Sequence, residues 1–232
     1  MLAGRVVVCV TYDDLDEPAD TVVRLRADEP VRAGGSIVVP VRQGATMGAP
    51  FSGSVFLGMS VDGFIARLDG DLSFLTGGGD AGGAPDDGEG GDFGFAEFVS
   101  GIDALVMGRS TYEFIAPFEE WPYQGRPVHV LSATLAEGAD PRITVHRSLD
   151  DAVAAIGSAG YRRVYVDGGR TVHAFLRAGL IADLTLSRVP VLIGTGHTPF
   201  GELPADIPLE HVRTQTFPSG MVQTTYRVRS PA

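Results

Sequence analysis

Apolar runs of strand length alternate with stretches of helical periodicity from about residue 54 to the end of the chain. The runs predict strands over 54–60, 104–107, 128–132, 143–146, 161–166 and 182–191. Between them, apolar residues at helical spacing predict a short helix near 69–75 and longer helices over 93–102, after Ser148 and after Thr171. Strands that alternate with helices form mainly parallel sheets with helices on both faces, so we expect an α/β fold.

Two further apolar runs at the end of the chain predict a different pairing. Residues 211–217 and 221–228 flank a turn at Pro218-Ser219-Gly220. Two strands joined by so short a turn pair antiparallel. We therefore expect a C-terminal antiparallel β-hairpin at the edge of the parallel sheet.

Residues 1–50 read differently from the rest. Two short apolar runs, 6–10 and 36–41, are separated by a stretch rich in Asp, Glu and Arg. This predicts an N-terminal extension that is either a small β appendage or poorly ordered, with Met47 as an alternative natural start. Residues 51–232 are expected to form one domain. Within it, Thr76–Gly91 is rich in Gly and Asp, which predicts a flexible loop. This loop would either interrupt the region that closes over a substrate or act as a lid over it.

The segment 103–113 joins a strand to a helix. Gly108 ends the apolar run, and Ser110-Thr111-Tyr112-Glu113 has the spacing of a helix capping box. The first N–H groups of a helix have no partner within it and favour an anion. Arg109 and the hydroxyls of Ser110 and Thr111 could grip a phosphate there; the alternative is an ordinary turn with a surface arginine.

Four loops follow predicted strands and should meet at one edge of the sheet, where α/β proteins bind ligands. Glycines in three of them would let a phosphate approach the backbone. Together they favour a dinucleotide site, although no G-x-G-x-x-G fingerprint is present. Gly168-Gly169 as a tight turn and Gly194–Gly196 as a bulged loop remain alternatives. The four loops are Gly108–Thr111, Ser132–Thr134, Asp167–Thr171 and Gly194–Gly196.

Composition narrows the classes of function. A net charge of −11 and a pI near 4.8 argue against nucleic acid or an anionic membrane as the main partner. Cys9 is the only cysteine, which excludes a disulfide framework and the zinc-deaminase signature. With no apolar run of membrane-spanning length, we expect a cytoplasmic protein. The histidines are interpreted as isolated, which disfavours a metal site: His129, His146, His173, His197 and His211.

Five motifs in order carry a family resemblance over residues 54–229; the first fifty residues lie outside it. The G-R-x-T-x-E and strand-Gly-Gly elements are specific together, although either alone would be weak. The chain resembles the dihydrofolate reductase-like family that includes the C-terminal reductase domain of the bifunctional riboflavin-biosynthesis deaminase-reductase. The motifs are S-V-D-G-F-I-A (60–66), D-L-S-F-L (71–75), M-G-R-S-T-Y-E (107–113), V-D-G-G (166–169) and V-P-V-L-I-G (189–194).

The resemblance implies NADPH as the hydride donor. Ser132 would help to bind the 2′-phosphate, with Arg109 supplying positive charge. In dihydrofolate reductases the pair that corresponds to Gly168 and Gly169 is joined by a cis peptide, expected here only if the geometry facing the ligand demands it. The resemblance also implies a homodimer. The remaining cofactor-binding residues that we expect are Gly108, Ser110, Thr111, Arg170, Thr171 and Gly194.

The resemblance also suggests Asp62 and Asp71 for the substrate side. Asp62 matches the aspartate of the family's S-x-D-G element, which lies near the nicotinamide and the substrate. Asp71 lies where dihydrofolate reductases place the carboxylate that helps to protonate the pterin, and burial could raise its pKa. The alternative for Asp71 is a helix cap, and for Asp62 a turn residue. Trp121 either lines the pocket or packs a loop.

The predicted function is that of an NADPH-dependent reductase acting on a small molecule. Hydride would pass to a C=N or C=O bond of a heterocyclic or sugar-derived compound, with a pterin or a ribosylaminopyrimidinone phosphate as specific possibilities. A nucleotide-binding module or sensor without catalysis is the alternative from another class.

Overall fold

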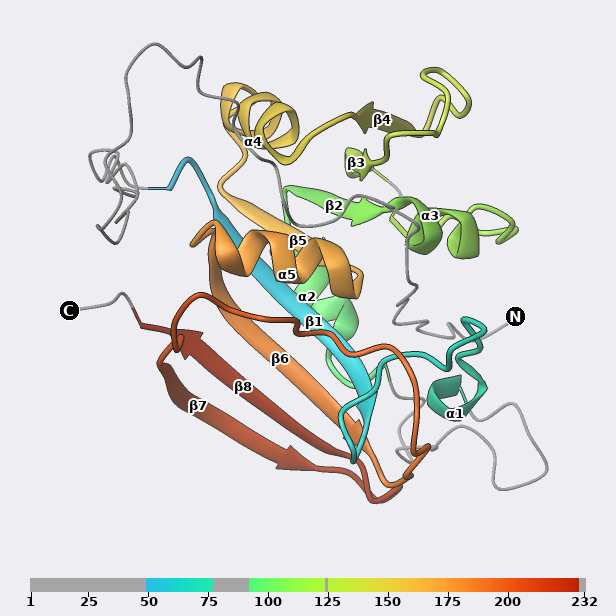
Figure 1. Ribbon diagram of the computed structural model, residues 1–232, viewed down its shortest axis with the longest axis vertical. Coiled ribbons are helices and arrows are strands. Elements are labelled where there is room, and N and C mark those ends of the chain that lie inside the picture. The colour runs from blue at the N-terminus through green and yellow to red at the C-terminus, as the bar shows by residue number, and fades with distance from the viewer. Residues whose placement is uncertain (1–48, 77–91, 124, 230–232) are drawn as a thin grey trace, which may run out of the picture.

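The computed structural model of the protein describes residues 49–76, 92–123 and 125–229 (Figure 1). The strands and alternative start considered within residues 1–48 lie outside these ranges, and so does nearly all of the loop predicted for 76–91.

A single eight-stranded sheet forms the centre of the molecule, in the order β4-β3-β2-β5-β1-β6-β8-β7 (Figure 1). Strands β1 to β6 run parallel, while β8 pairs antiparallel with both β6 and β7. The predicted parallel sheet with a C-terminal antiparallel hairpin is confirmed. The strands are β1 (Ser52–Ser60), β2 (Ala104–Gly108), β3 (Val128–Leu131), β4 (Ile143–His146), β5 (Arg163–Asp167), β6 (Ile181–Val189), β7 (Leu209–Thr216) and β8 (Val222–Val228).

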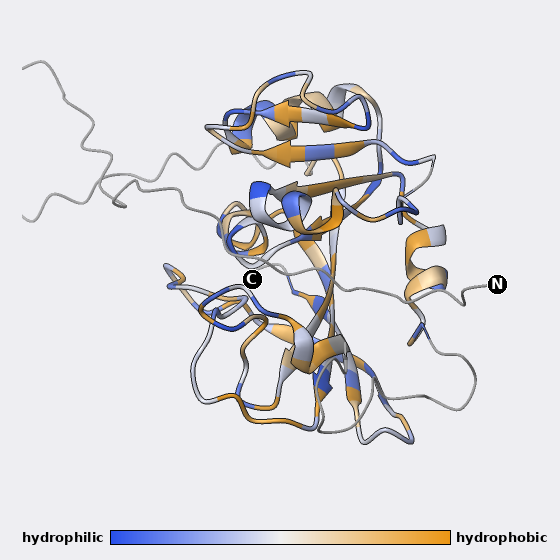
Figure 2. Ribbon diagram, turned by 90° about the vertical axis from the view of Figure 1, so that its right-hand side faces the viewer, coloured by the Kyte–Doolittle hydropathy of each residue, from blue (hydrophilic) through white to orange (hydrophobic). Residues whose placement is uncertain are grey.

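Helices cover the sheet on both sides. On one face, Ile156 of α4 and Val172 and Phe175 of α5 pack on side chains of β1 and β5. On the other, Phe95 and Phe98 of α2 and residues of α3 pack with the alternate side chains of the strands. Hydrophobic residues are concentrated in the strands (Figure 2). The helices are α1 (Ser73–Thr76), α2 (Phe95–Ser100), α3 (Arg109–Ile115), α4 (Leu149–Ser158) and α5 (Gly169–Arg177).

Local signals explain where several elements begin and end. Ser148 caps α4, because its Oγ accepts a hydrogen bond from the Asp151 N–H at 3.1 Å. Gly179, with φ of 68°, follows the end of α5 in the left-handed conformation that glycine adopts without strain. In the hairpin, Phe217 N–H bonds to the Met221 carbonyl at 3.0 Å across the predicted turn.

Two local predictions were wrong. Helix α3 begins at Arg109 with Gly108 as its N-cap, so Ser110 and Glu113 lie inside the helix and form no capping box. Glu113 instead lies 3.8 Å from the Arg109 guanidinium, one turn back. The alternation of Leu184 and Leu186 with Asp183, Thr185 and Ser187 predicts a strand with one more solvated face, but Thr185 and Ser187 of β6 are buried.

The connections that leave β2 and β5 run towards opposite edges of the sheet. Helix α3 leads from β2 outward to β3 on one face, whereas α5 leads from β5 past β1 to β6 on the other face. Because these connections diverge, the carboxyl ends of β2 and β5 frame the switch point at which doubly wound sheets bind their ligands.

Candidate functional site

The loops that follow β2 and β5 touch at this switch point. Gly168 adopts φ of 87° and ψ of 133° as the N-cap of α5. A Cβ built on it would lie 2.6 Å from Thr111 Oγ1 and 3.8 Å from the Gly108 nitrogen. Only glycine fits so close an approach, and the structure thus brings together two of the four predicted loops. Among the described residues no peptide bond is cis, so the Gly168–Gly169 bond is trans.

The loop after β3 joins the same group through Arg109. The Arg109 Nη1 donates a hydrogen bond to Thr134 Oγ1 at 2.9 Å. Ser132 is buried, and its Oγ accepts the N–H groups of Thr134 and Leu135 at 3.2 and 2.9 Å. Arg147 closes the loop from outside, donating from Nη1 to the Ser132 and Leu135 carbonyls, both at 2.8 Å. Arg109 and Ser132 therefore lie on adjoining loops, as expected.

The fourth loop is bound to the end of β1. The Asp62 carboxylate accepts the N–H groups of Ile193 and Gly194 at 3.3 and 2.8 Å. Hydrogen bonding from the Ser60 side chain, and then from these two N–H groups, holds the pKa of Asp62 below its ordinary value. These contacts match the turn-residue interpretation of Asp62.

Asp71 caps the short helix α1. Its carboxylate accepts the Ser73 N–H at 3.2 Å and the Ser73 hydroxyl at 2.6 Å, and it pairs with Arg67 at 3.2 Å. These partners, the Ser73 hydroxyl first, lower the pKa of Asp71. The expectation of a buried carboxyl with a raised pKa was wrong, since the side chain is 42% exposed. The bond from the Ser73 N–H matches the helix-cap alternative for Asp71.

A different carboxyl has the properties that we expected of Asp71. Asp167 ends β5 and is fully buried. Its Oδ1 accepts the Gly168 N–H at 2.8 Å, while Oδ2 has no hydrogen-bond partner among the described residues. Burial raises the pKa of Asp167 to about 8, against the opposing effects of the Gly168 N–H and the Tyr165 side chain. Asp167 is therefore largely protonated at neutral pH, directly beside the Gly168–Thr111 contact.

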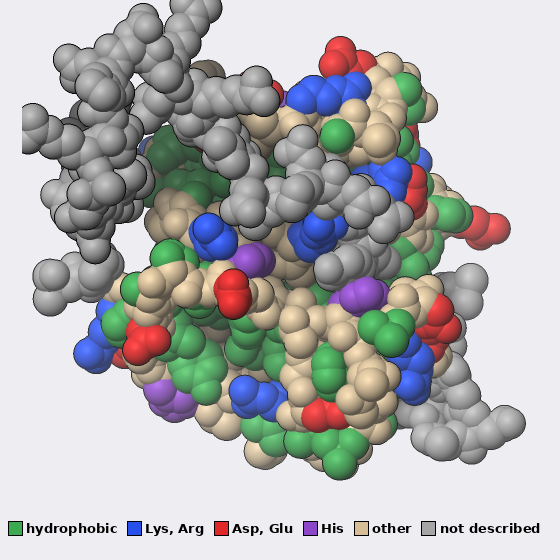
Figure 3. All heavy atoms as spheres, in the orientation of Figure 1, with side chains coloured by type: hydrophobic (Ala, Val, Ile, Leu, Met, Phe, Trp, Pro, Cys, Tyr) green, Lys and Arg blue, Asp and Glu red, His purple; other side chains and the backbone are tan. Residues whose placement is uncertain are grey.

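The two remaining predicted residues on α5 point in different directions. Thr171 is buried beneath the helix, whereas Arg170 is partly exposed. Basic and histidine side chains gather over α5 in the space-filling view (Figure 3). Arg170, His173 and Arg177 follow the i, i+3, i+7 spacing of one helical stripe.

The interpretation of all histidines as isolated was wrong for two of them. His129 Nδ1 and His146 Nε2, on neighbouring strands β3 and β4, lie 2.8 Å apart in a buried hydrogen bond. Burial, and then the neighbouring His146, lowers the pKa of His129 to about 4. Within the described residues no group of three or more His, Cys, Asp or Glu is arranged to hold a metal ion.

Comparison with known proteins places this geometry in a family. Residues 53–223 match the family model described as the RibD C-terminal domain, which spans more than half of the chain. The protein belongs to the RibD C-terminal domain family. This confirms the resemblance that the motifs carried.

Solved structures agree with the family assignment. A putative riboflavin biosynthesis protein from Shewanella sp. PV-4 is 32% identical, with a TM-score of 0.68 over 78% of this chain and 100% of that one. The fold is also that of the Thermotoga maritima diaminohydroxyphosphoribosylaminopyrimidine deaminase/5-amino-6-(5-phosphoribosylamino)uracil reductase, at 13% identity and a TM-score of 0.59. This chain spans 57% of that longer protein.

Among relatives known by sequence, the uncharacterized protein YwjB of Bacillus subtilis (strain 168) is 26% identical over 167 residues, which cover 70% of this chain and 90% of YwjB. Within the described part of this RibD C-terminal domain, no helix has the length and apolar character needed to cross a membrane.

Asp167 was predicted only as part of the loop Asp167–Thr171, and sequence reasoning missed that its carboxyl is buried. The signal was present, because an acidic residue follows the apolar run 164–166 immediately before Gly168-Gly169. An acidic side chain at the end of a core strand is rarely buried without a partner. What the sequence did not reveal is that no described side chain neutralises it.

Proposed function

We propose that the protein is an NADPH-dependent reductase that transfers hydride to a C=N or C=O bond of a small heterocyclic or sugar-derived molecule. The observation that carries the proposal is the buried carboxyl of Asp167 at the switch point, whose Oδ2 has no hydrogen-bond partner among the described residues, next to a turn that needs glycine at position 168. Family membership supports a reductase of the riboflavin-biosynthesis type.

The residues fit a dinucleotide. Because Gly168 has no side chain, its backbone lies close to the Thr111 hydroxyl and the Gly108 nitrogen, and the turns that carry Gly108 and Gly168 would together border a diphosphate. Ser110 belongs to the same turn, and Gly169, Arg170 and Thr171 begin the helix on the other side. Ser132 and Arg109 would bind the adenosine end with its 2′-phosphate, as a guanidinium is well suited to phosphate. Gly194, held by Asp62, would border the nicotinamide end.

Reduction of a C=O or C=N bond needs one hydride and one proton. When bound, NADPH supplies the hydride. Asp167 would supply the proton from its protonated carboxyl, which is left as a carboxylate and recovers a proton from water after product leaves. Asp62 and Asp71 are poor acids at neutral pH because their pKa values are lowered. In this proposal Asp62 positions the Gly194 loop, and Asp71 caps α1.

Titration with NADPH, followed by its fluorescence and by calorimetry, tests the proposal. We expect saturable binding at micromolar cofactor, and oxidation of NADPH with at least one member of a panel of carbonyl, imine, dihydropterin and ribosylaminopyrimidinone phosphate compounds. No binding at millimolar NADPH would overturn the cofactor assignment. Tight binding with no oxidation across the panel would favour a nucleotide-binding module instead. The homodimer and the cytoplasmic location stay predictions, and light scattering checks the first.

A further inference from the structure

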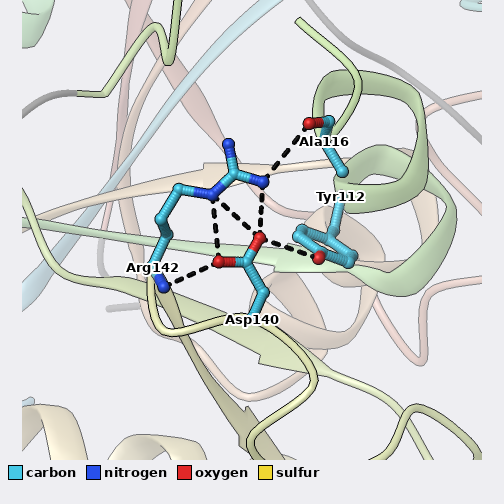
Figure 4. Close-up of polar contacts among 4 residues, drawn as sticks. All are labelled: Tyr112, Ala116, Asp140 and Arg142. Carbon is cyan, nitrogen blue, oxygen red and sulfur yellow. Dashed lines mark hydrogen bonds and ion pairs between the residues drawn. The ribbon is translucent and has the colours of Figure 1, made fainter.

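One buried carboxylate joins helix α3 to the loop between β3 and β4. The Asp140 side chain is 8% exposed. It accepts the Tyr112 hydroxyl at 3.0 Å and the Arg142 Nε at 2.8 and 2.9 Å (Figure 4). The Arg142 Nη2 also donates to the Ala116 carbonyl at 3.3 Å, at the end of α3. A single carboxylate–guanidinium unit thus binds α3 at two places.

A third contact lies at the start of the same helix. The Arg109 guanidinium donates to Thr134 Oγ1 of the β3–β4 loop. The contacts at Arg109, Tyr112 and Ala116 therefore follow α3 from its first residue to its C-cap. The loop that makes them begins at Ser132, and the helix begins next to Gly108. The two segments that would hold the two phosphate positions of the cofactor are fastened to each other along their whole length.

The charge in this connection is permanent. Hydrogen bonding from Arg142 lowers the pKa of Asp140 to about 2, so the carboxylate is ionised at neutral pH. A buried ion pair is often no more stabilising than apolar packing, but it specifies one geometry. Removal of one partner leaves a buried group unsatisfied.

Trp121 lies directly against this pair. The Arg142 guanidinium is 4.3 Å from the Trp121 ring centre, and Trp121 meets Tyr123 edge-on at 5.9 Å. Trp121 thus packs on Arg142 and Tyr123, which matches the loop-packing alternative for it. Because it is the only tryptophan in the chain, tryptophan emission reports on the surroundings of Trp121, which include Arg142.

We propose that Asp140, acting through Tyr112 and Arg142, is a positioning residue that sets the spacing between the Gly108–Thr111 segment and the Ser132 loop, and thereby the affinity for a nucleotide that carries phosphates at both positions. The inference rests on the proposed function. Tyr112 adjoins Thr111, which in turn meets Gly168. A shift of α3 would therefore move the diphosphate side relative to the 2′-phosphate side.

The test compares two ligands on four proteins. Adenosine 2′,5′-bisphosphate spans both segments, whereas 5′-AMP reaches one, and neither absorbs at the emission wavelength of tryptophan. Affinities are measured by calorimetry and by Trp121 emission for wild type, Tyr112→Phe, Asp140→Asn and the control Asp183→Asn. Asp183 also pairs with an arginine, Arg163, at 3.5 Å, but at the opposite end of the strands. Circular dichroism and thermal unfolding establish folding; Tyr112→Phe removes a single oxygen atom and keeps the ion pair.

We expect Tyr112→Phe and Asp140→Asn to weaken binding of the bisphosphate roughly 3- to 30-fold, a range that fits residues acting through another element. Binding of 5′-AMP should change little, and Asp183→Asn should match wild type for both ligands. A merely structural role would lower both affinities together. If wild type binds NADPH and the ratio of the two affinities is the same in every variant, this inference is overturned and the proposed function stands. If wild type binds no NADPH, both are overturned.

Discussion

Gly168 faces Thr111 across the gap between β5 and β2, so closely that a Cβ on Gly168 would lie 2.6 Å from Thr111 Oγ1. The two residues are 57 positions apart by their numbers and belong to helices on opposite faces of the sheet. Their contact brings the strand-to-helix turns after β2 and β5 together at the switch point of the sheet.

Substitution of Gly168 by alanine should therefore remove cofactor binding. The methyl group would displace Thr111, and the backbone, at φ of 87°, disfavours any L side chain. The matched control is Gly160→Ala, which has a similar φ of 75° but nothing within 4 Å of the added Cβ. Both variants should lose about 1–2 kcal/mol of stability from backbone strain. Only Gly168→Ala should lose NADPH affinity, by tenfold or more in calorimetry; equal affinity in both variants would contradict the site.

Asp167→Asn should stabilise the protein as pH rises. The folded-state pKa of Asp167, about 8, lies above that of an ordinary aspartate, so stability is present in acid and declines between about pH 4 and 8. At pH 7, roughly three pH units above the ordinary value, the wild type bears a cost of about 1–4 kcal/mol that the amide avoids. Urea unfolding at pH 4.5 and 7.5 measures the difference. A gain that does not grow with pH would be inconsistent with a protonated Asp167.

The same variant separates the candidate acids. Once a substrate is known, Asp167→Asn should lower kcat for it by about 100-fold or more, because the general acid is lost. Wild-type kcat should fall as pH rises through about 8. Asp71→Asn, the control carboxyl, should keep most of the activity and lose about 1 kcal/mol or less from its helix cap. If instead Asp71→Asn abolished turnover and Asp167→Asn did not, the acid would be misassigned.

Arg109→Ala should weaken NADPH more than NADH. The guanidinium is held towards the β3–β4 loop by Thr134, where the 2′-phosphate would lie. Loss of one charged contact to phosphate costs about 1.5–3 kcal/mol, or roughly 10- to 150-fold. Parallel titrations with the two cofactors measure the ratio, with Arg213→Ala on the exposed edge strand β7 as the control. An equal loss for both cofactors would show that Arg109 does not read the 2′-phosphate.

The pair of His129 and His146 should make the β3–β4 edge sensitive to acid. The pKa of His129 is depressed to about 4, so the stability from its neutral form is present above about pH 6.5 and is lost as pH falls towards 4. The loss amounts to roughly 2–3 kcal/mol. His129→Gln should flatten the pH dependence of thermal unfolding in this window, while His211→Gln on β7 should not. Identical curves for wild type and His129→Gln would exclude the pair as the cause.

Local patterns were sufficient for most of the fold. Each strand and helix predicted within the described residues is present, because apolar spacing decides which face of an element is buried. The turn at Gly220 and the cap at Ser148 were also readable, since both depend on neighbours in sequence. The capping box predicted at Ser110 was wrong. Its spacing was right, but α3 starts directly after β2 at Arg109, with Gly108 as the N-cap, so Ser110 lies in the first turn of the helix.

The site needed more than local pattern. That four loops meet at one edge follows from parallel strands, and the sequence reached that conclusion alone. Which side chains are buried and unpaired does not, because it depends on neighbours distant in the chain. Asp71 looked like the acid by position, yet Ser73 and Arg67 lower its pKa. Asp167 was named only as the start of a glycine-containing loop, because its burial beside β2 cannot be read from the sequence.

The sequence by itself determined the class of fold, the order of the elements, the family and the glycine-containing loops, because periodicity and motifs are properties of short segments. Only the tertiary structure decided that Gly168 meets Thr111, that Asp140 fastens α3 to the β3–β4 loop, and that Asp167 is enclosed. Desolvation and contact distance depend on which segments pack together, and strand order in the sheet sets that packing.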